Sequence, residues 1–388
     1  MKIATLPSLA RTALRLAPAA MAAVAMLSAP ALAAPQAKPD QVFRINPRTN
    51  KASTVTGTVT EDGLDNVKVT RRDGREISIK SAEVIQIAWG SGSTAFSDGG
   101  TYAGRGAWED AVKSYQEAAG DSAVRDPLRA EARLRAATSL MALAASDMTR
   151  FGDVAGECDR FMTDFPSARQ VPEVLALKSR AQWLNGDAAA ARDGYRSIYD
   201  AGNGGAEGYS PITTADAAMH GAYAAISAGD NVGARELFDL AAAAYGAIES
   251  ENASVMAAAA AGAEVAGMGE AITKASSGDA KSVRRTFESA SKSSETSAGM
   301  AAAHLGLGHA WLAEGDFRKA QFEFAWVAGL DHTSADRRAE ALVGLAEAGL
   351  KAGEAGDANA AKTALRQVAS QYGATPSARK AAQLLESL

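Results

Sequence analysis

The sequence has little of the material needed for metal or thiol chemistry. It contains one cysteine, Cys158, and four histidines in 388 residues. A single cysteine allows neither an intramolecular disulfide nor a thiolate metal cluster. His304 and His309 are five residues apart, about 140° around a helix, so they do not share a face as a metal-binding pair would. We therefore expect no metal and no cofactor, and we expect Cys158 to be a small buried apolar residue.

Motifs of catalysis are also missing. No serine stands in a nucleophile-elbow motif, and carboxylates recur only at spacings that any acidic helix shows. The segment Gly90–Ala95 (GSGSTA) matches a loose dinucleotide-binding fingerprint, but no β-α-β unit follows it. We interpret this segment as a linker. The sequence predicts a protein without enzymatic activity.

Neither basic nor aromatic residues are in excess. The chain has 40 Lys and Arg against 45 Asp and Glu, and Phe, Trp and Tyr together make up 6%. A nucleic-acid-binding protein would carry a basic stripe, so we expect no nucleic-acid partner. A carbohydrate-binding groove would need aromatic platforms, which makes that alternative weaker.

The first 33 residues have the pattern of a secretory signal peptide. Three basic residues precede the apolar run Leu16–Leu27, and Ala31-Leu32-Ala33 follows before Ala34. The apolar run is about a dozen residues long, whereas a membrane-spanning helix needs about 20. We predict cleavage after residue 33 and export to the periplasm or beyond, without stable membrane insertion of the mature chain. A retained anchor is the alternative.

Residues 34–91 predict a linker and a small β module. Segments 54–60, 67–71, 76–80 and 83–88 alternate in hydrophobicity or are β-branched, and Asp62-Gly63 and Asp73-Gly74 mark turns. The order of these segments, with a glycine at the centre of the first, resembles a small SH3-like or Sm-like barrel. A domain of this size has a marginal core, so we expect it to pack against the first helices or against another copy of itself.

Residues 92–388 repeat a glycine-centred pattern at intervals of 34 to 49 residues. A glycine accepts the left-handed conformation that ends one helix, and an aspartate after it caps the next helix. Six of the seven glycines are followed by aspartate; the seven are Gly106, Gly152, Gly186, Gly229, Gly278, Gly315 and Gly356.

Residues at fixed offsets from these glycines complete the pattern. A small residue precedes each glycine by seven positions and lets paired helices come close. A mostly small residue, with Glu157 as the exception, follows by five positions. The residue that follows by nine positions fills the gap between helix pairs; these residues are Tyr115, Phe161, Tyr195, Phe238, Phe287, Phe324 and Leu365. Each pair buries little alone, so neighbouring pairs must stack.

This arrangement resembles the tetratricopeptide repeat (TPR), most closely in the set Gly308, Trp311, Gly315, Asp316, Phe317, Ala320 and Phe324. The resemblance implies a mainly α protein, with a helical-hairpin solenoid of about seven repeats over residues 92–388. It also implies that the first helices line a groove that binds peptides or protein segments. Arg180, Gln182 and Lys274 are candidates for polar contacts in that groove; the alternative is that they are ordinary solvated residues.

Two short segments before helices point to one group of TPR proteins. The segments Phe161–Ala168 (FMTDFPSA) and Gln371–Ala378 (QYGATPSA) are similar to aromatic–Pro–Ser–small junctions of exported bacterial TPR proteins. This similarity implies a non-catalytic scaffold or adaptor for protein–protein interaction in the bacterial cell envelope. Two alternatives remain open, namely a self-assembling structural envelope protein and a peptidoglycan- or carbohydrate-binding protein.

Overall fold

The N-terminal strands form a five-stranded antiparallel sheet in the order β4-β3-β2-β1-β5. The strands are β1 (Asp40–Asn46), β2 (Lys51–Asp62), β3 (Asn66–Thr70), β4 (Glu76–Lys80) and β5 (Val84–Ala88). A 3-10 turn at Ser81–Glu83 joins β4 to β5. Alternating side chains bury one face, whose core consists of Val42, Val55, Val59, Val67, Val69, Ile79 and Ile87. Gly57 is required because a Cβ there would lie 2.5 Å from the Thr70 carbonyl oxygen.

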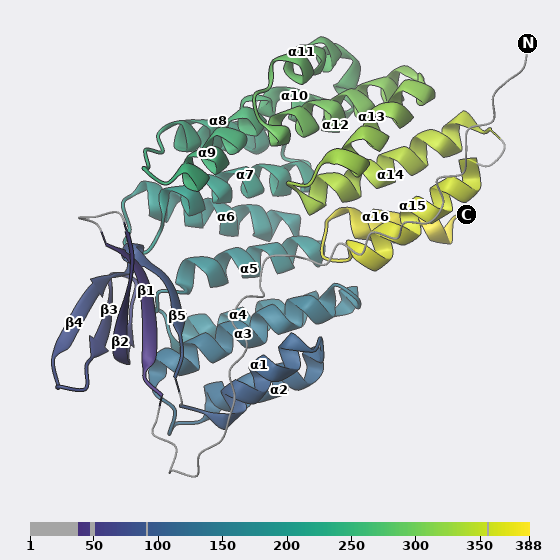
Figure 1. Ribbon diagram of the computed structural model, residues 1–388. Coiled ribbons are helices and arrows are strands. Elements are labelled where there is room, and N and C mark those ends of the chain that lie inside the picture. The colour runs from purple at the N-terminus through teal and green to yellow at the C-terminus, as the bar shows by residue number, and fades with distance from the viewer. Residues whose placement is uncertain (1–37, 47–50, 91, 355–356) are drawn as a thin grey trace, which may run out of the picture. The chain divides into compact units, whose positions relative to one another are not determined.

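The rest of the chain is helical. The helices are α1 (Thr94–Gly104), α2 (Trp108–Gly120), α3 (Asp126–Ala144), α4 (Phe151–Asp164), α5 (Val171–Leu184), α6 (Ala188–Asn203), α7 (Pro211–Ser227), α8 (Asn231–Gly246), α9 (Ala253–Gly267), α10 (Gly269–Lys274), α11 (Ala280–Ser293), α12 (Ser297–Glu314), α13 (Phe317–Leu330), α14 (Ala335–Ala352), α15 (Asp357–Gln371) and α16 (Ser377–Glu386). Successive helices pack against each other along the array (Figure 1). The mainly α class and the small N-terminal sheet are therefore as expected.

This computed structural model describes residues 38–46, 51–90, 92–354 and 357–388. The signal peptide predicted over residues 1–33 lies outside the described residues, as does Gly356. From Pro39 onward the sheet and the helices belong to one compact unit. No single helix among the described residues is long and apolar enough to cross a membrane. The pair formed by α9 and the segment Gly269–Ser293 meets that criterion only when joined across a 48° bend.

The predicted glycine turns form at five of the six positions that lie among the described residues. Gly106, Gly186, Gly229, Gly278 and Gly315 have φ between 74° and 98°, in the left-handed region. The following aspartate caps the next helix at three of them, where Asp187, Asp230 and Asp316 accept hydrogen bonds from backbone amides three residues on. These turns connect antiparallel helices, as the pattern predicts.

The prediction for Gly152 is wrong. Gly152 lies inside the first turn of α4 and does not have a positive φ. The connection from α3 to α4 is instead made by Asp147, whose carboxylate accepts a hydrogen bond from the Thr149 amide, and by the short 3-10 helix Met148–Arg150. Near the end of the array, α14 stops at Gly353, which has a φ of 68°.

The predicted packing positions are all buried. The seven aromatic or leucine positions are at most 5% exposed, and Phe324 is fully buried. A Cβ on Gly308 or on Gly344 would lie 2.6 Å from the Phe324 ring, so both glycines allow neighbouring helices to reach it. The repeat pattern therefore identified the core of the helical array correctly.

The sheet packs against the helices through two buried aspartates. Asp40 in β1 accepts hydrogen bonds from the backbone amides of Val59 and Gly90 and from Arg125 at the start of α3. Asp62 at the end of β2 binds the guanidinium of Arg169 in the α4–α5 connection, and its backbone carbonyl accepts from the Arg169 amide. The predicted junction Phe161–Ala168 also holds the β module, because the Ser167 carbonyl accepts from the Leu64 amide and Ala168 bridges to Gly63.

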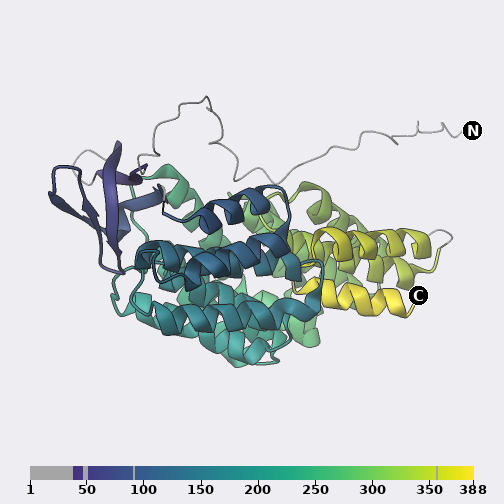
Figure 2. The same ribbon diagram turned by 90° about the horizontal axis from the view of Figure 1, so that it is seen from below.

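The C-terminal helices contact α5, although the bonded residues are 156 to 195 positions apart in the sequence (Figures 1 and 2). Arg180 of α5 donates to both carboxylate oxygens of Asp336 at the start of α14, one of them at 2.7 Å, and to the Ala374 carbonyl at 2.9 Å. Arg379 of α16 donates to the Leu184 carbonyl at 2.9 Å. We call this set of bonds the α5–α16 closure.

Candidate binding cavity

A cavity of about 660 Å³ lies between helices that the α5–α16 closure brings together. Its walls come mainly from α7, α9, α12, α14 and α16, and α5 contributes Trp183. The volume is within the range of small-molecule sites in proteins. A second hollow of about 590 Å³ shares Asp216, His220 and Asp336 with it.

Helix α7 supplies the polar group at the centre of the cavity wall. Asp216, His220 and Tyr223 lie at spacings of three and four residues, so they share one helix face. The Tyr245 hydroxyl from α8 bonds to the Asp216 carboxylate, and His220 Nδ1 lies 2.8 Å from the Asp216 backbone carbonyl. Because a carbonyl can only accept, Nδ1 carries the proton and Nε2 of neutral His220 is an acceptor. Burial, together with the Asp216 carboxylate, raises the pKa of Tyr245.

A second polar group lies on α12 and α14. His309 Nε2 lies 2.8 Å from a carboxylate oxygen of Glu340, and the ring of His309 meets Phe324 edge-on. Burial alone would raise the pKa of Glu340, but the hydrogen bond and charge of His309, with Lys380 and Arg337 nearby, bring it below its usual value. Glu340 is therefore a carboxylate at neutral pH.

The permanent cations around the two hollows already have carboxylate partners. Each makes an ion pair with a nearby acid: Arg180 with Asp336, Arg337 with the buried Asp331, and Lys380 with Glu347. Other parts of the lining are apolar, and α9 and α12 contribute mostly alanine and glycine there. Their small side chains leave the cavity its volume.

Of the three residues that the sequence suggested for polar contacts in a groove, only one lines either hollow. Arg180 lines the second hollow and is engaged by Asp336 and Ala374. Gln182 is half-buried on the same helix, and Lys274 of α10 pairs with Glu270 at 2.6 Å. Among the described residues that line the two hollows, neither Gln182 nor Lys274 is included. The site residues predicted from the sequence did not include Asp216, His220 or Glu340. The spacing of Asp216 and His220, which places both on one helix face, was a signal that could have identified those two.

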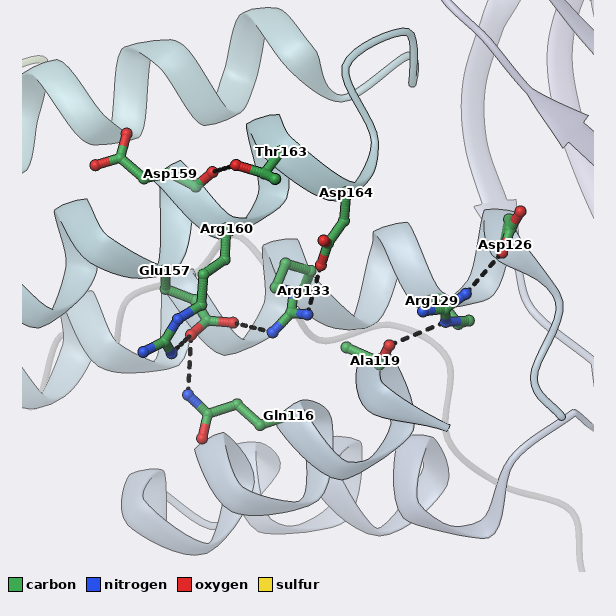
Figure 3. A network of polar contacts seen from close by, with 10 residues as sticks. All are labelled: Gln116, Ala119, Asp126, Arg129, Arg133, Glu157, Asp159, Arg160, Thr163 and Asp164. Carbon is green, nitrogen blue, oxygen red and sulfur yellow. Dashed lines mark hydrogen bonds and ion pairs between the residues drawn. The ribbon is translucent and has the colours of Figure 1, made fainter. Parts of the chain in front are cut away.

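Another polar cluster surrounds Glu157, the exception to the small-residue pattern. Glu157 is 1% exposed and accepts hydrogen bonds from Gln116, Arg133 and Arg160, while Arg133 also binds Asp164 (Figure 3). The three donors come from α2, α3 and α4. The cluster therefore joins three helices, and the Glu157 side chain has no exposed surface for a ligand.

Cys158 lies in the core of the helical array. Cys158 is fully buried, and burial raises the pKa of its thiol to about 12, which makes it unreactive at neutral pH. Within the described ranges, no group of three or more His, Cys, Asp or Glu side chains is placed to hold a metal ion.

Comparison with known proteins assigns no family. No protein-family model matches the chain. No curated protein matches its sequence.

Proposed function

We propose that this chain is a non-catalytic scaffold or adaptor for protein–protein interaction in the bacterial cell envelope, exported by its N-terminal signal. The observation that carries the proposal is the regular series of helix pairs, with a buried packing residue in each and glycine turns in five of them. We interpret this series as a TPR-like solenoid of about seven repeats. Such arrays offer broad surfaces for other proteins and exclude water poorly, which favours binding over catalysis.

The small sheet also fits the interpretation of the protein as a scaffold. Its strand order and the 3-10 turn between β4 and β5 fit an SH3-like barrel. Because it is fixed to α3 and to the α4–α5 connection by Asp40 and Asp62, we interpret it as part of the scaffold.

One helix offers a face for a partner. On α13, Phe322, Ala325, Gly329 and Leu330 are exposed and lie on one side of the helix, with the half-buried Trp326 between them. Phe322 is 68% exposed and Leu330 is 58% exposed. Apolar side chains gathered on one exposed face mark interaction sites more often than single ones do. The partner chemistry that fits is an apolar helix face of another envelope protein.

Site-specific photo-crosslinking in the native cell tests the proposal. With a photoreactive residue at Phe322, we expect cross-links to one or a few defined envelope proteins, lost when Leu330→Asp is added. The matched control places the same residue at Lys113, which is exposed on α2. Equal labelling at both positions, or no protein adduct at Phe322, would argue against a scaffold that binds through α13.

Self-assembly is the second candidate, and the sheet edge favours it. β5 pairs only with β1 in the described residues, and Ile85 on β5 is 56% exposed. An exposed apolar edge strand is a template for pairing with another chain. Light scattering would show a stable oligomer that Ile85→Lys converts to a monomer; a monomeric wild-type protein would exclude this candidate.

A further inference from the structure

The charges around the central cavity do not balance. Arg180, Arg337 and Lys380 are each neutralised by their own carboxylate partner, as described above. Although Arg337 and Lys380 lie near Glu340, two carboxylates of the lining make no ion pair with an arginine or lysine in the described part of the chain, namely Asp216 on α7 and Glu340 on α14. Their hydrogen-bond partners are a tyrosine hydroxyl and an imidazole, neither of which is a permanent cation.

Asp216 has the capacity for another donor. The Tyr245 hydroxyl bonds to its Oδ1, and no hydrogen bond to its Oδ2 is found in the part of the chain that the structure describes. A carboxylate accepts about four hydrogen bonds. His220, which shares this wall, adds a ring nitrogen acceptor at Nε2. The polar end of the cavity is therefore rich in acceptors and poor in cations.

The rest of the cavity lining suits the apolar part of a ligand. Ala258, Ala261 and Gly262 of α9 face the cavity together with Ala298 and Ala302 of α12. Aromatic side chains complete the lining: Trp183, Tyr223, Tyr245 and Phe287. Aromatic faces attract cations as well as apolar groups.

We infer that this cavity is a binding site for a small organic amine, with its ammonium group at Asp216 and its apolar body against the wall of α9 and α12. An ammonium group carries a positive charge and N–H donors, so it can pair with the Asp216 carboxylate and donate to the acceptor nitrogen of His220. An anionic ligand of the same shape would be repelled by both Asp216 and Glu340 in a partly enclosed site, where charge interactions are stronger than in water. This inference is independent of the proposed scaffold function.

Three matched probes test the charge preference on the full-length mature protein. 4-Phenylbutylamine, 4-phenylbutanol and 4-phenylbutyrate share one body and differ in the charge of the head group. Trp183 lines the cavity, so its fluorescence reports occupancy alongside calorimetry. We expect the amine to bind at least tenfold more tightly than the alcohol and the carboxylate. Carboxylate binding that equals or exceeds amine binding, or no binding by the amine, overturns the inference.

Substitutions locate the site. Asp216→Asn keeps the shape of the side chain and removes its charge, so amine affinity should fall at least tenfold to the level of the alcohol. The control is Asp239→Asn, an exposed aspartate on α8 outside the cavity lining, which should leave affinity unchanged. Equal affinity of Asp216→Asn and wild type overturns the inference.

A volume-filling variant keeps the test decisive if Asp216→Asn does not fold. Ala261→Leu retains every charge but occupies part of the cavity, so it should weaken the amine and the alcohol together. Circular dichroism melts confirm that each variant is folded. Unchanged amine binding in folded Ala261→Leu would place the site elsewhere and overturn the inference.

Discussion

Single side chains hold the helices of this protein together where the repeat pattern departs from its rule. Glu157 occupies a position that is otherwise filled by small residues or valine, and it is as buried as they are. The structure compensates by directing two arginines and an amide at its carboxylate. A carboxylate that is paired with two arginines and bound by an amide tolerates burial that an isolated charge would not.

Removal of this carboxylate should be costly. In Glu157→Ala, Arg133 loses a partner while its side chain remains only 13% exposed, so we expect a loss of about 3 kcal/mol in the free energy of unfolding. Urea denaturation monitored by circular dichroism measures the loss. Glu117→Ala, at an exposed position on α2, is the matched control and should change stability by less than about 0.5 kcal/mol. Similar losses in both variants would contradict this role.

Cys158 should make the protein sensitive to alkali. Its thiol pKa is about 12 in the folded state and about 8.5 in the unfolded chain, so above pH 8.5 only the unfolded thiol ionises. Stability therefore falls as pH rises through this window. Between pH 8 and 9.5, wild type should lose about 1 kcal/mol more than Cys158→Ala. Parallel pH profiles of the two proteins, or iodoacetamide labelling of the native thiol, would refute the assignment.

At the scale of the helix, the offset pattern read from the sequence corresponds to real contacts. Glycine turns at Gly186, Gly229 and Gly315 end one helix, and the next aspartate caps the following one. The pattern failed at Gly152 because Asp147 and a 3-10 turn provide an alternative connection of similar length. The local sequence therefore predicts that the chain turns here, but it does not show whether the turn is made at the glycine or at a nearby aspartate cap.

The ring of Phe324 should account for much of the stability of its helix pair. Phe324→Ala would leave a void against Gly308 and Gly344, and we expect it to cost about 3–5 kcal/mol. Phe322→Ala, two residues earlier on the exposed face of α13, is the control and should cost less than about 0.5 kcal/mol. Thermal and urea unfolding of the two variants decide the point; equal effects would mean that the repeat offsets are coincidental.

At the scale of the whole molecule, the α5–α16 closure joins parts of the chain that the repeat pattern treats as independent. Arg180 makes three of its hydrogen bonds. The closure also has apolar support, because Ala374 packs against the core around Phe151 and Phe161, and Met148 packs against the C-terminal core. It therefore determines the surroundings of the central cavity.

Removing the bonds of the α5–α16 closure should destabilise only the helices near it. In Arg180→Ala combined with Arg379→Ala, we expect backbone amides of α16 to exchange hydrogen at least tenfold faster, while those of α8 keep their protection. Hydrogen-exchange mass spectrometry measures both in one sample. If α16 exchanges at the wild-type rate, the polar bonds contribute nothing to the closure, and Arg180 would again be a candidate for a partner contact.

Export can be tested on protein from its native cell. Because Ala31-Leu32-Ala33 ends a short apolar run, we predict a mature N-terminus at or next to Ala34. Intact-mass spectrometry of the native protein measures it. A chain that retains residues 1–30 would refute both the signal peptide and the periplasmic placement.

The sequence by itself determined the helical class, four of the five strands and the buried position in every helix pair, because these follow from short-range periodicity and from glycine and aspartate at turns. It missed β1 (Asp40–Asn46), which lies in a segment interpreted as a polar linker. It did not reveal the closure or the cavity. Arg180 and Asp336 are 156 residues apart, and no local pattern links them. Their pairing, and the meeting of Asp216, Tyr245 and Glu340 around one cavity, depend on the tertiary packing of helices that are far apart in the sequence.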